Sequence, residues 1–224
     1  MSHLKLEVVD ADGAIREAAA TAGLDRGDFL KKGALAGGGL LVGSAMFSGV
    51  LSSAEAAISI TRKSAANDVK ILNYALTLEF LEATFYEQAV ANQAYGGSAA
   101  LKQFAEIVAV HERKHVNFLR GALGAKAIKS PAFDFGDAVT DQAKFAATAQ
   151  VLEDTGVSAY LGQVGNISAR GTLAAAATIT TVEARHAGWI RTINGELGAP
   201  LSFDKRKSER SILKAVGETG FIKP

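Results

Sequence analysis

ERKHVNFLR (residues 112–120) recurs in the second half of this chain as EARHAGWIR (residues 183–191). Both stretches read Glu-x-x-His-x-x-aromatic-aliphatic-Arg. Glu and His three positions apart lie on one face of a helix, with their Cβ atoms about 5–6 Å apart. Each stretch therefore predicts a helix that presents one carboxylate and one imidazole to the same neighbour.

A second unit precedes each of these stretches and is also repeated. Glu79 is followed by Tyr86 at plus seven, and Glu153 is followed by Tyr160 at the same spacing. Leu-Gly-Ala and then a segment with Pro, Phe and Asp follow each Glu-x-x-His stretch. Because all these features recur together, chance similarity between alanine-rich helices does not explain them. The repeat predicts two helical hairpins that close face to face around a pseudo-two-fold axis.

Four such helices would bring four carboxylates and two imidazoles into one core. The six candidate metal ligands are Glu79, Glu112, His115, Glu153, Glu183 and His186. Burying four uncompensated carboxylates costs several kcal/mol each, so the core requires about four positive charges. Two divalent ions supply them, and oxygen-rich ligation with two imidazoles favours iron or manganese. We expect the Glu of each Glu-x-x-His to bridge both ions, each His to bind one ion, and the other two glutamates to bind terminally.

Residues beside these ligands leave alternatives open. Glu82 lies three positions after Glu79 and could replace it as the ligand from the first helix. We prefer Glu79 because a Tyr follows it at plus seven, as in the second half of the chain. No residue is assigned a catalytic role from the sequence.

Three further side chains have two or more interpretations. Tyr86 and Tyr160 either hydrogen-bond to carboxylates beside the metal site or are core tyrosines whose hydroxyls are satisfied elsewhere. His111 lies four positions before His115 and therefore on the same helix face. It could lie at the boundary of the core, support a ligand, or bind metal itself.

Apolar residues recur at helical spacing from Ala66 onward. They predict four helices with approximate ranges 68–92, 99–123, 140–167 and 173–194, the first capped by Asn67 or Asp68. The link over residues 124–139 has no helical period and contains Pro131. A 25-residue helix is roughly 37 Å long and 16 extended residues reach roughly 50 Å. The link can therefore run the whole length of the bundle, so that the second and third helices point the same way.

The stretch ILNYALTLEFLEATFY (residues 71–86) resembles the first helix of bacterial and plant ferritin-like-domain proteins, which include the desiccation-related proteins. PAFDF (residues 131–135) resembles their crossover, and the resemblance covers about residues 66–205. It implies an all-α, ferritin-like four-helix bundle with a long crossover between helices 2 and 3 and an internal two-fold repeat. Members of this superfamily include ferroxidases, peroxidases, catalases and oxygenases, so the resemblance implies metal binding more specifically than it implies one reaction.

Residues 1–56 differ from the rest of the chain. Gly33 to Ala54 carries no charge and ends in a small-x-small pattern, Ala54-Glu55-Ala56. DRGDFLK (residues 25–31) resembles a twin-arginine export signal with Gly27 in place of the second Arg. We expect a leader that is removed on export to the periplasm or the extracellular space. The alternatives are an uncleaved membrane anchor, since an uncharged run of this length can span a bilayer, or a helix packed on the bundle.

The remaining organisation follows from composition. The chain has 224 residues, 48% of them hydrophobic, a formal net charge of +1 and no Cys. This suits one globular domain over residues 57–200, followed by a tail over residues 201–224 with a short outer helix near residues 208–216. We expect no nucleic-acid partner, and the absence of Cys excludes disulfides, thiolate metal sites and a rubredoxin-type domain. A homo-oligomer stays open, and membrane contact is expected only if the leader is uncleaved.

We therefore expect an exported protein that binds two divalent ions, iron or manganese, and acts as an oxidoreductase on peroxide, dioxygen or ferrous iron in stress protection. The alternative is a structural, desiccation-stress protein whose metal site is vestigial or serves only stability.

Overall fold

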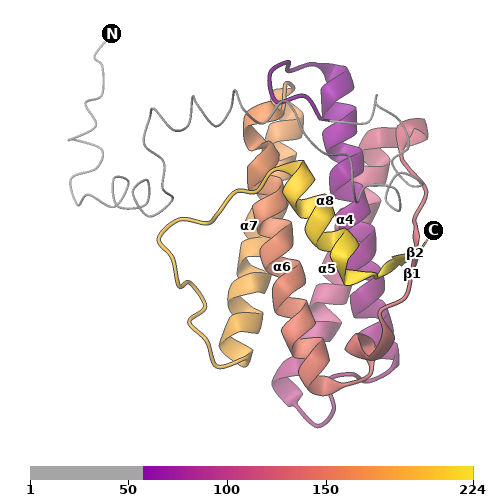
Figure 1. Cartoon of the computed structure of the whole chain (residues 1–224), viewed down its shortest axis with the longest axis vertical. Helices are drawn as coiled ribbons and strands as arrows, with labels where there is room; N and C mark the ends of the chain where they lie inside the picture. The colour runs from indigo at the N-terminus through magenta and orange to yellow at the C-terminus, as the bar shows by residue number, and fades with distance from the viewer. Residues whose placement is uncertain (1–57, 224) are drawn as a thin grey trace. The chain divides into compact units, whose positions relative to one another are not determined.

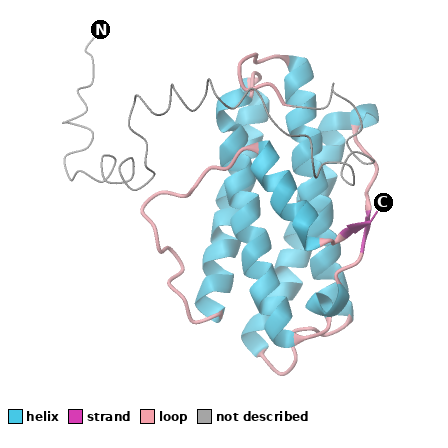
Figure 2. Ribbon diagram, viewed as in Figure 1, coloured by secondary structure: helices cyan, strands magenta, loops and turns pink. Residues whose placement is uncertain are grey.

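A computed structural model describes residues 58–223 of the chain (Figure 1). Four long helices lie side by side and form a bundle, which confirms the predicted all-α fold (Figure 2). Their bounds are α4 Ala65–Ala91, α5 Ala99–Leu123, α6 Gln142–Gln163 and α7 Arg170–Ile193. The second helix has the predicted bounds, whereas α4 and α7 each begin about one turn earlier than predicted.

The start of α4 differs from the prediction because Ser64, not Asn67 or Asp68, caps it. The Ser64 hydroxyl accepts a hydrogen bond from the backbone N–H of Asn67 at 3.1 Å. The buried carboxylate of Asp68 instead accepts from the backbone N–H groups of Ser168 and Ala169, each at 2.8 Å. These two residues precede α7, and Ala169 has no side-chain acceptor of its own. Asp68 therefore fixes the beginning of a helix that is distant in the sequence.

The connection between α5 and α6 runs along the side of the bundle from one end to the other (Figure 1). It contains the 3-10 helices η2 (Gly124–Lys126) and η3 (Gly136–Val139) and the strand β1 (Ala132–Phe133). Short links join α4 to α5 and α6 to α7, the second of them with η4 (Val164–Asn166). The helices on either side of the long connection therefore point the same way, as the crossover prediction requires.

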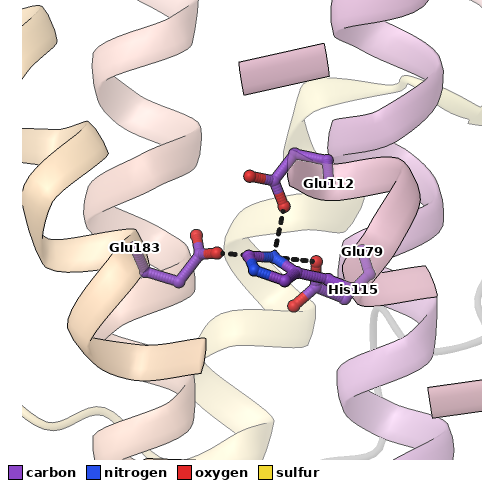
Figure 3. Close-up of side chains that lie close together, drawn as sticks. All are labelled: Glu79, Glu112, His115 and Glu183. Atoms are coloured by element: carbon purple, nitrogen blue, oxygen red, sulfur yellow. Dashed lines mark hydrogen bonds and ion pairs between the residues drawn. The ribbon is translucent and has the colours of Figure 1, made fainter. Parts of the chain in front are cut away.

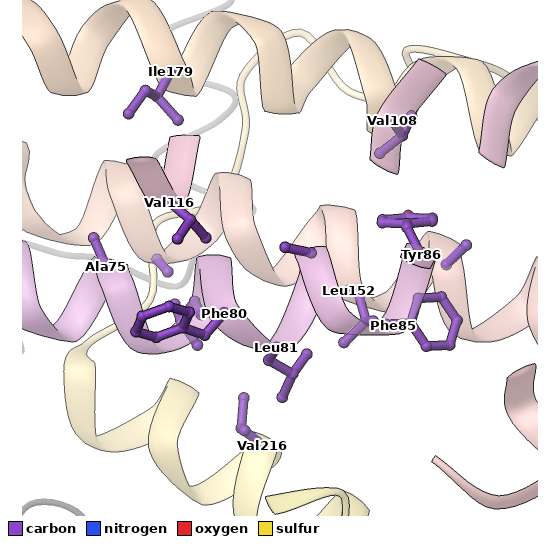
Figure 4. Close-up of a cluster of buried hydrophobic side chains, with 14 of the residues drawn as sticks. Ala75, Phe80, Leu81, Phe85, Tyr86, Val108, Val116, Leu152, Ile179 and Val216 are labelled. Carbon is purple, nitrogen blue, oxygen red and sulfur yellow. The ribbon is translucent and has the colours of Figure 1, made fainter. Parts of the chain in front are cut away.

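The C-terminal segment packs on the bundle and does not lie free outside it. Helix α8 (Glu209–Thr219) buries Ile212 and Val216, and Figure 4 shows Val216 beside Leu81 of α4. The strand β2 (Ile222–Lys223) then pairs antiparallel with β1, with Ala132 opposite Lys223. The predicted outer helix is thus present, but it covers one side of the core and leads into a strand that holds the crossover.

Apolar side chains fill much of the space between the helices (Figure 4). Phe85, Phe104 and Phe145 are fully buried, and the rings of Phe85 and Phe145 stack with centroids 5.5 Å apart. Burying one Phe side chain contributes about 1.5–3 kcal/mol. The bundle therefore has a large apolar core around the charged residues at its centre.

The expected leader, residues 1–56, lies outside the described residues, and so does the membrane anchor considered for it. Within residues 58–223, no helix is both long enough and apolar enough to cross a membrane.

Candidate metal centre

The six predicted ligands converge inside the bundle, and each of the four long helices supplies at least one. Glu79 comes from α4, Glu153 from α6, and one Glu-x-x-His pair from each of α5 and α7. The four glutamates are 0% exposed. His186 is 3% exposed, and the side chain of His115 is 12% exposed. The apolar stripes of the helices determine this placement, because each ligand lies on the face that turns inward.

The first group of ligands surrounds the imidazole of His115 (Figure 3). Its Nδ1 lies 3.0 Å from Oε2 of Glu112, 3.1 Å from Oε1 of Glu183 and 3.3 Å from Oε2 of Glu79. One ligand atom from each of these four residues lies within 4.8 Å of the others. The two hairpins therefore meet at this point, since Glu183 belongs to the second half of the chain.

The second group surrounds His186 in the corresponding way. Its Nδ1 lies 3.1 Å from Oε1 of Glu112 and 3.3 Å from Oε2 of Glu153. Together with Glu183, these residues again offer ligand atoms within 4.8 Å of one another. Glu112 and Glu183 belong to both groups, and the two oxygens of Glu112 face different histidines. The carboxylates expected to bridge two ions are thus the ones that the groups share.

Buried polar atoms without a hydrogen-bond partner test whether these residues fit a metal pair. Six of the seven such side-chain atoms in residues 58–223 belong to the predicted ligands. They are Oε2 of Glu79, Oε1 of Glu112, Oε2 of Glu153, both carboxylate oxygens of Glu183 and Nδ1 of His186. An unpaired buried acceptor costs free energy, and a set of them around one point is explained by a cation that they share. The donor set therefore fits bound metal.

The electrostatics of the cluster show the same need for positive charge. Burial, with the neighbouring Glu112, raises the pKa of Glu79 from 4.5 to about 8. Burial likewise raises the pKa of Glu153 and Glu183. Burial opposes the charge on His186, but Glu112 and Glu153 outweigh it and raise the pKa of His186 to about 10. Without metal, protons must therefore balance part of the carboxylate charge.

Tyr86 and Tyr160 hydrogen-bond to the terminal glutamates, which decides between their two interpretations. The Tyr86 hydroxyl donates to Oε1 of Glu153 at 2.5 Å, and the Tyr160 hydroxyl donates to Oε1 of Glu79. Each tyrosine thus reaches the carboxylate of the opposite half of the chain, although it follows the glutamate of its own half in the sequence. The repeated Glu-to-Tyr spacing identified the residues, but the exchange of partners depends on how the helices pack.

Replacing either tyrosine should destabilise the protein. Tyr86→Phe and Tyr160→Phe each leave a buried carboxylate oxygen without its donor, so we expect each to lower the free energy of unfolding by about 1–3 kcal/mol. Tyr74→Phe is the matched control, because the Tyr74 hydroxyl is buried without a partner among residues 58–223 and its loss should cost little. Urea denaturation of the metal-free proteins measures the difference. Equal losses for all three variants would contradict this role for the hydrogen bonds.

A fifth buried carboxylate lies next to the predicted ligands. Glu82 is 3% exposed, and burial together with Glu183 raises its pKa well above the ordinary value. Neither ligand group drawn from residues 58–223 includes it, so Glu79 remains the candidate ligand from α4. Aligning Glu79 with Glu153 pairs Glu82 with Gly156. A Cβ atom at Gly156 would lie 3.1 Å from Oε1 of Glu82 and 3.1 Å from Oε2 of Glu183.

Gly156 thus leaves room for the carboxyl group of Glu82. This arrangement was not predicted from the sequence. The signal was present, because the second copy of the repeat has glycine at the position where the first has glutamate. Only the packing of α6 against α4 shows that the two positions face each other.

His111 also lies at the edge of the site. Its Nδ1 is 2.9 Å from Nε2 of His186, so of the three roles left open for His111 the structure favours support of a ligand. Burial and the neighbouring His186 lower the pKa of His111.

Comparisons with known proteins address the family of the chain. A search of curated proteins returned no relative. The model of the ferritin-like domain family matches residues 67–196, which span the four long helices and the crossover. The match covers more than half of the chain and includes all six predicted ligands. With the bundle, the crossover and the carboxylate–histidine cluster, it shows that this chain belongs to the ferritin-like domain family.

Proposed function

We propose that the protein binds two divalent ions, iron or manganese, and acts as an oxidoreductase on peroxide, dioxygen or ferrous iron. The observation that carries this proposal is the set of unpaired buried ligand atoms in two groups that share Glu112 and Glu183. Oxygen-rich ligation with one imidazole per group suits iron and manganese better than metals that prefer thiolates.

The proposed roles of the residues follow from their contacts. Glu112 and Glu183 would bridge the ions, His115 and His186 would each bind one, and Glu79 and Glu153 would bind terminally. Two adjacent redox-active ions can exchange two electrons with a small oxidant. The tyrosine hydroxyls hold one oxygen of each terminal carboxylate and leave the other oxygen unpaired for a ligand bond. These hydrogen bonds orient the carboxylates before metal arrives.

Burial of the site limits the size of any substrate. The glutamates are inaccessible to solvent, so a molecule that reaches them must be small. An apolar cavity of about 20 Å³ lies beside Tyr160, and its lining includes Ile71, the half-exposed Phe118 and Ala176. This volume holds about one water-sized molecule. None of the six predicted ligands lines this cavity, so the burial of the glutamates is what favours peroxide or dioxygen over a larger organic molecule.

Metal analysis and turnover test the proposal together. Protein purified from its native compartment should contain two ions per chain by elemental analysis, and the metal-loaded protein should consume peroxide or oxidise ferrous iron. The double variant His115→Ala/His186→Ala is the control, because it keeps the apolar core and loses both imidazoles. A wild-type protein that binds neither iron nor manganese would overturn the proposal.

The closed site also favours a second candidate, a structural metal centre in a stress-protection protein. Structural metal sites have no open coordination position, and none of the four glutamates is exposed. In that case metal would raise the melting temperature, while the metal-loaded protein would show no turnover of peroxide or ferrous iron above the double variant.

We also propose that the protein is exported. The support is the uncharged run Gly33–Ala54 and the small-x-small pattern that ends it. N-terminal sequencing of the mature protein should find a start close to residue 57. A start at Met1 in the exported fraction would refute cleavage and favour the membrane anchor.

A further inference from the structure

The two ring nitrogens of His186 face different surroundings. Nδ1 points toward Glu112 and Glu153 inside the ligand cluster, at 3.1 and 3.3 Å. Nε2 lies 2.9 Å from Nδ1 of His111, outside the cluster. The two ring planes differ by only 19° and their centroids are 5.2 Å apart. This geometry suits a hydrogen bond between ring nitrogens that meet edge to edge.

The contact can support the tautomer of His186 that binds a cation through Nδ1. A neutral imidazole carries one proton, so Nδ1 has a free lone pair only if the proton is on Nε2. In that tautomer Nε2 donates to Nδ1 of His111, which must then carry its own proton on Nε2. His111 therefore stabilises the form of His186 that can act as a ligand and fixes the orientation of its ring.

The second half of the chain has no equivalent of this histidine. Aligning the two Glu-x-x-His stretches pairs His111 with Val182, whose side chain can neither accept nor donate a hydrogen bond. The Nδ1 of His115 faces three carboxylates of the cluster, as Nδ1 of His186 faces two, but within residues 58–223 Nε2 of His115 has no hydrogen-bond partner that corresponds to His111. The two ligand groups are therefore related by the repeat but supported differently.

We propose that His111 is a positioning residue that supports only the metal subsite around His186, so that the two ions are not bound equivalently. This inference rests on the proposed function, because it assumes that the cluster binds metal. It adds that one step of binding depends on a side chain that is not itself a ligand.

Equilibrium titration with Mn²⁺ tests the proposal in the full chain. His111→Ala should weaken one of the two binding steps by roughly 10–100-fold and leave the other unchanged. His111→Asn should recover most of this loss, because its amide oxygen lies where Nδ1 of the histidine lay and can accept from His186. Val182→Ala is the matched control at the equivalent position and should change neither step. Since His111 is only partly buried, water can replace its ring nitrogen beside His186, and melting temperatures of the metal-free variants should stay close to that of the wild type.

Ligand variants assign the affected step. In a His115→Ala background, His111→Ala should still weaken the remaining ion, whereas in a His186→Ala background it should have no further effect. Equal weakening of both steps, no weakening, or failure of the Asn variant to recover affinity would overturn the proposal while leaving the proposed function intact. A wild-type protein that binds no Mn²⁺ or Fe²⁺ would overturn both.

Discussion

Glu112→Ala should abolish binding of both metal ions, whereas His115→Ala should affect mainly one. The two oxygens of Glu112 lie 3.0 Å from Nδ1 of His115 and 3.1 Å from Nδ1 of His186, so one carboxylate serves both ligand groups. Loss of an outer partner of a metal ligand costs roughly 10–100-fold in affinity, and loss of a shared ligand should exceed this for each ion. Elemental analysis and Mn²⁺ titration measure the stoichiometry.

The matched control for this variant is Glu106→Ala on the same helix. Glu106 is exposed and pairs with Lys102 at 3.8 Å, a surface contact worth at most about 1 kcal/mol. The Glu106→Ala variant should bind two ions with wild-type affinity. If Glu112→Ala still bound one ion tightly, Glu112 would belong to a single subsite and the bridging assignment would be wrong.

Removing metal should destabilise the protein more at pH 8 than at pH 5. The pKa of Glu79 rises on folding from 4.5 to about 8, so the folded, metal-free protein holds a proton that the unfolded chain releases. The stability that this proton provides is complete below pH 4.5 and is lost as the pH rises toward 8. Glu82, Glu153 and Glu183 shift in the same direction.

The shifted pKa values of His186 and Glu112 do not reverse this trend between pH 5 and pH 8. The pKa of His186 rises to about 10, so its contribution is also lost as the pH increases. Burial opposes ionisation of Glu112, but His115 and His186 lower its pKa to about 2, and the resulting stability is lost only in strong acid. Bound metal ions replace the protons, and their affinity rises with pH because the ligands must be deprotonated.

Melting curves with and without a chelator measure this effect. One group contributes up to about 1.4 kcal/mol per pH unit, and 1 kcal/mol corresponds to about 2–4 °C in a protein of this size. The metal-free protein should therefore melt several degrees lower at pH 8 than at pH 5. Glu112→Ala is the control, since a variant without metal should not respond to the chelator. A wild-type melting temperature indifferent to chelator at every pH would favour the structural, metal-free interpretation.

Local sequence patterns predicted the helices and the residues that face the centre of the bundle. The Glu-x-x-His spacing depends only on helical geometry, so the positions of His115 and His186 beside the shared carboxylates followed from the sequence. Contacts between distant segments could not be predicted in this way. The bond from Tyr160 to Glu79 and the room that Gly156 leaves for Glu82 depend on the axial register of neighbouring helices. Asp68 was interpreted as a local cap, but it fixes the start of α7 across the bundle.

The exchange of tyrosine partners between the two halves has a consequence for the way this site could evolve. Two separate copies of one hairpin could form the same crossed contacts as a homodimer, but every substitution would then appear twice. Such a dimer would also come apart on dilution, whereas a fused chain keeps both halves together at any concentration. Fusion allows single changes, and two of them lie beside the ligand cluster: Glu82 faces Gly156, and His111 corresponds to Val182. In a fused chain, the surroundings of one ligand group can therefore differ from those of the other.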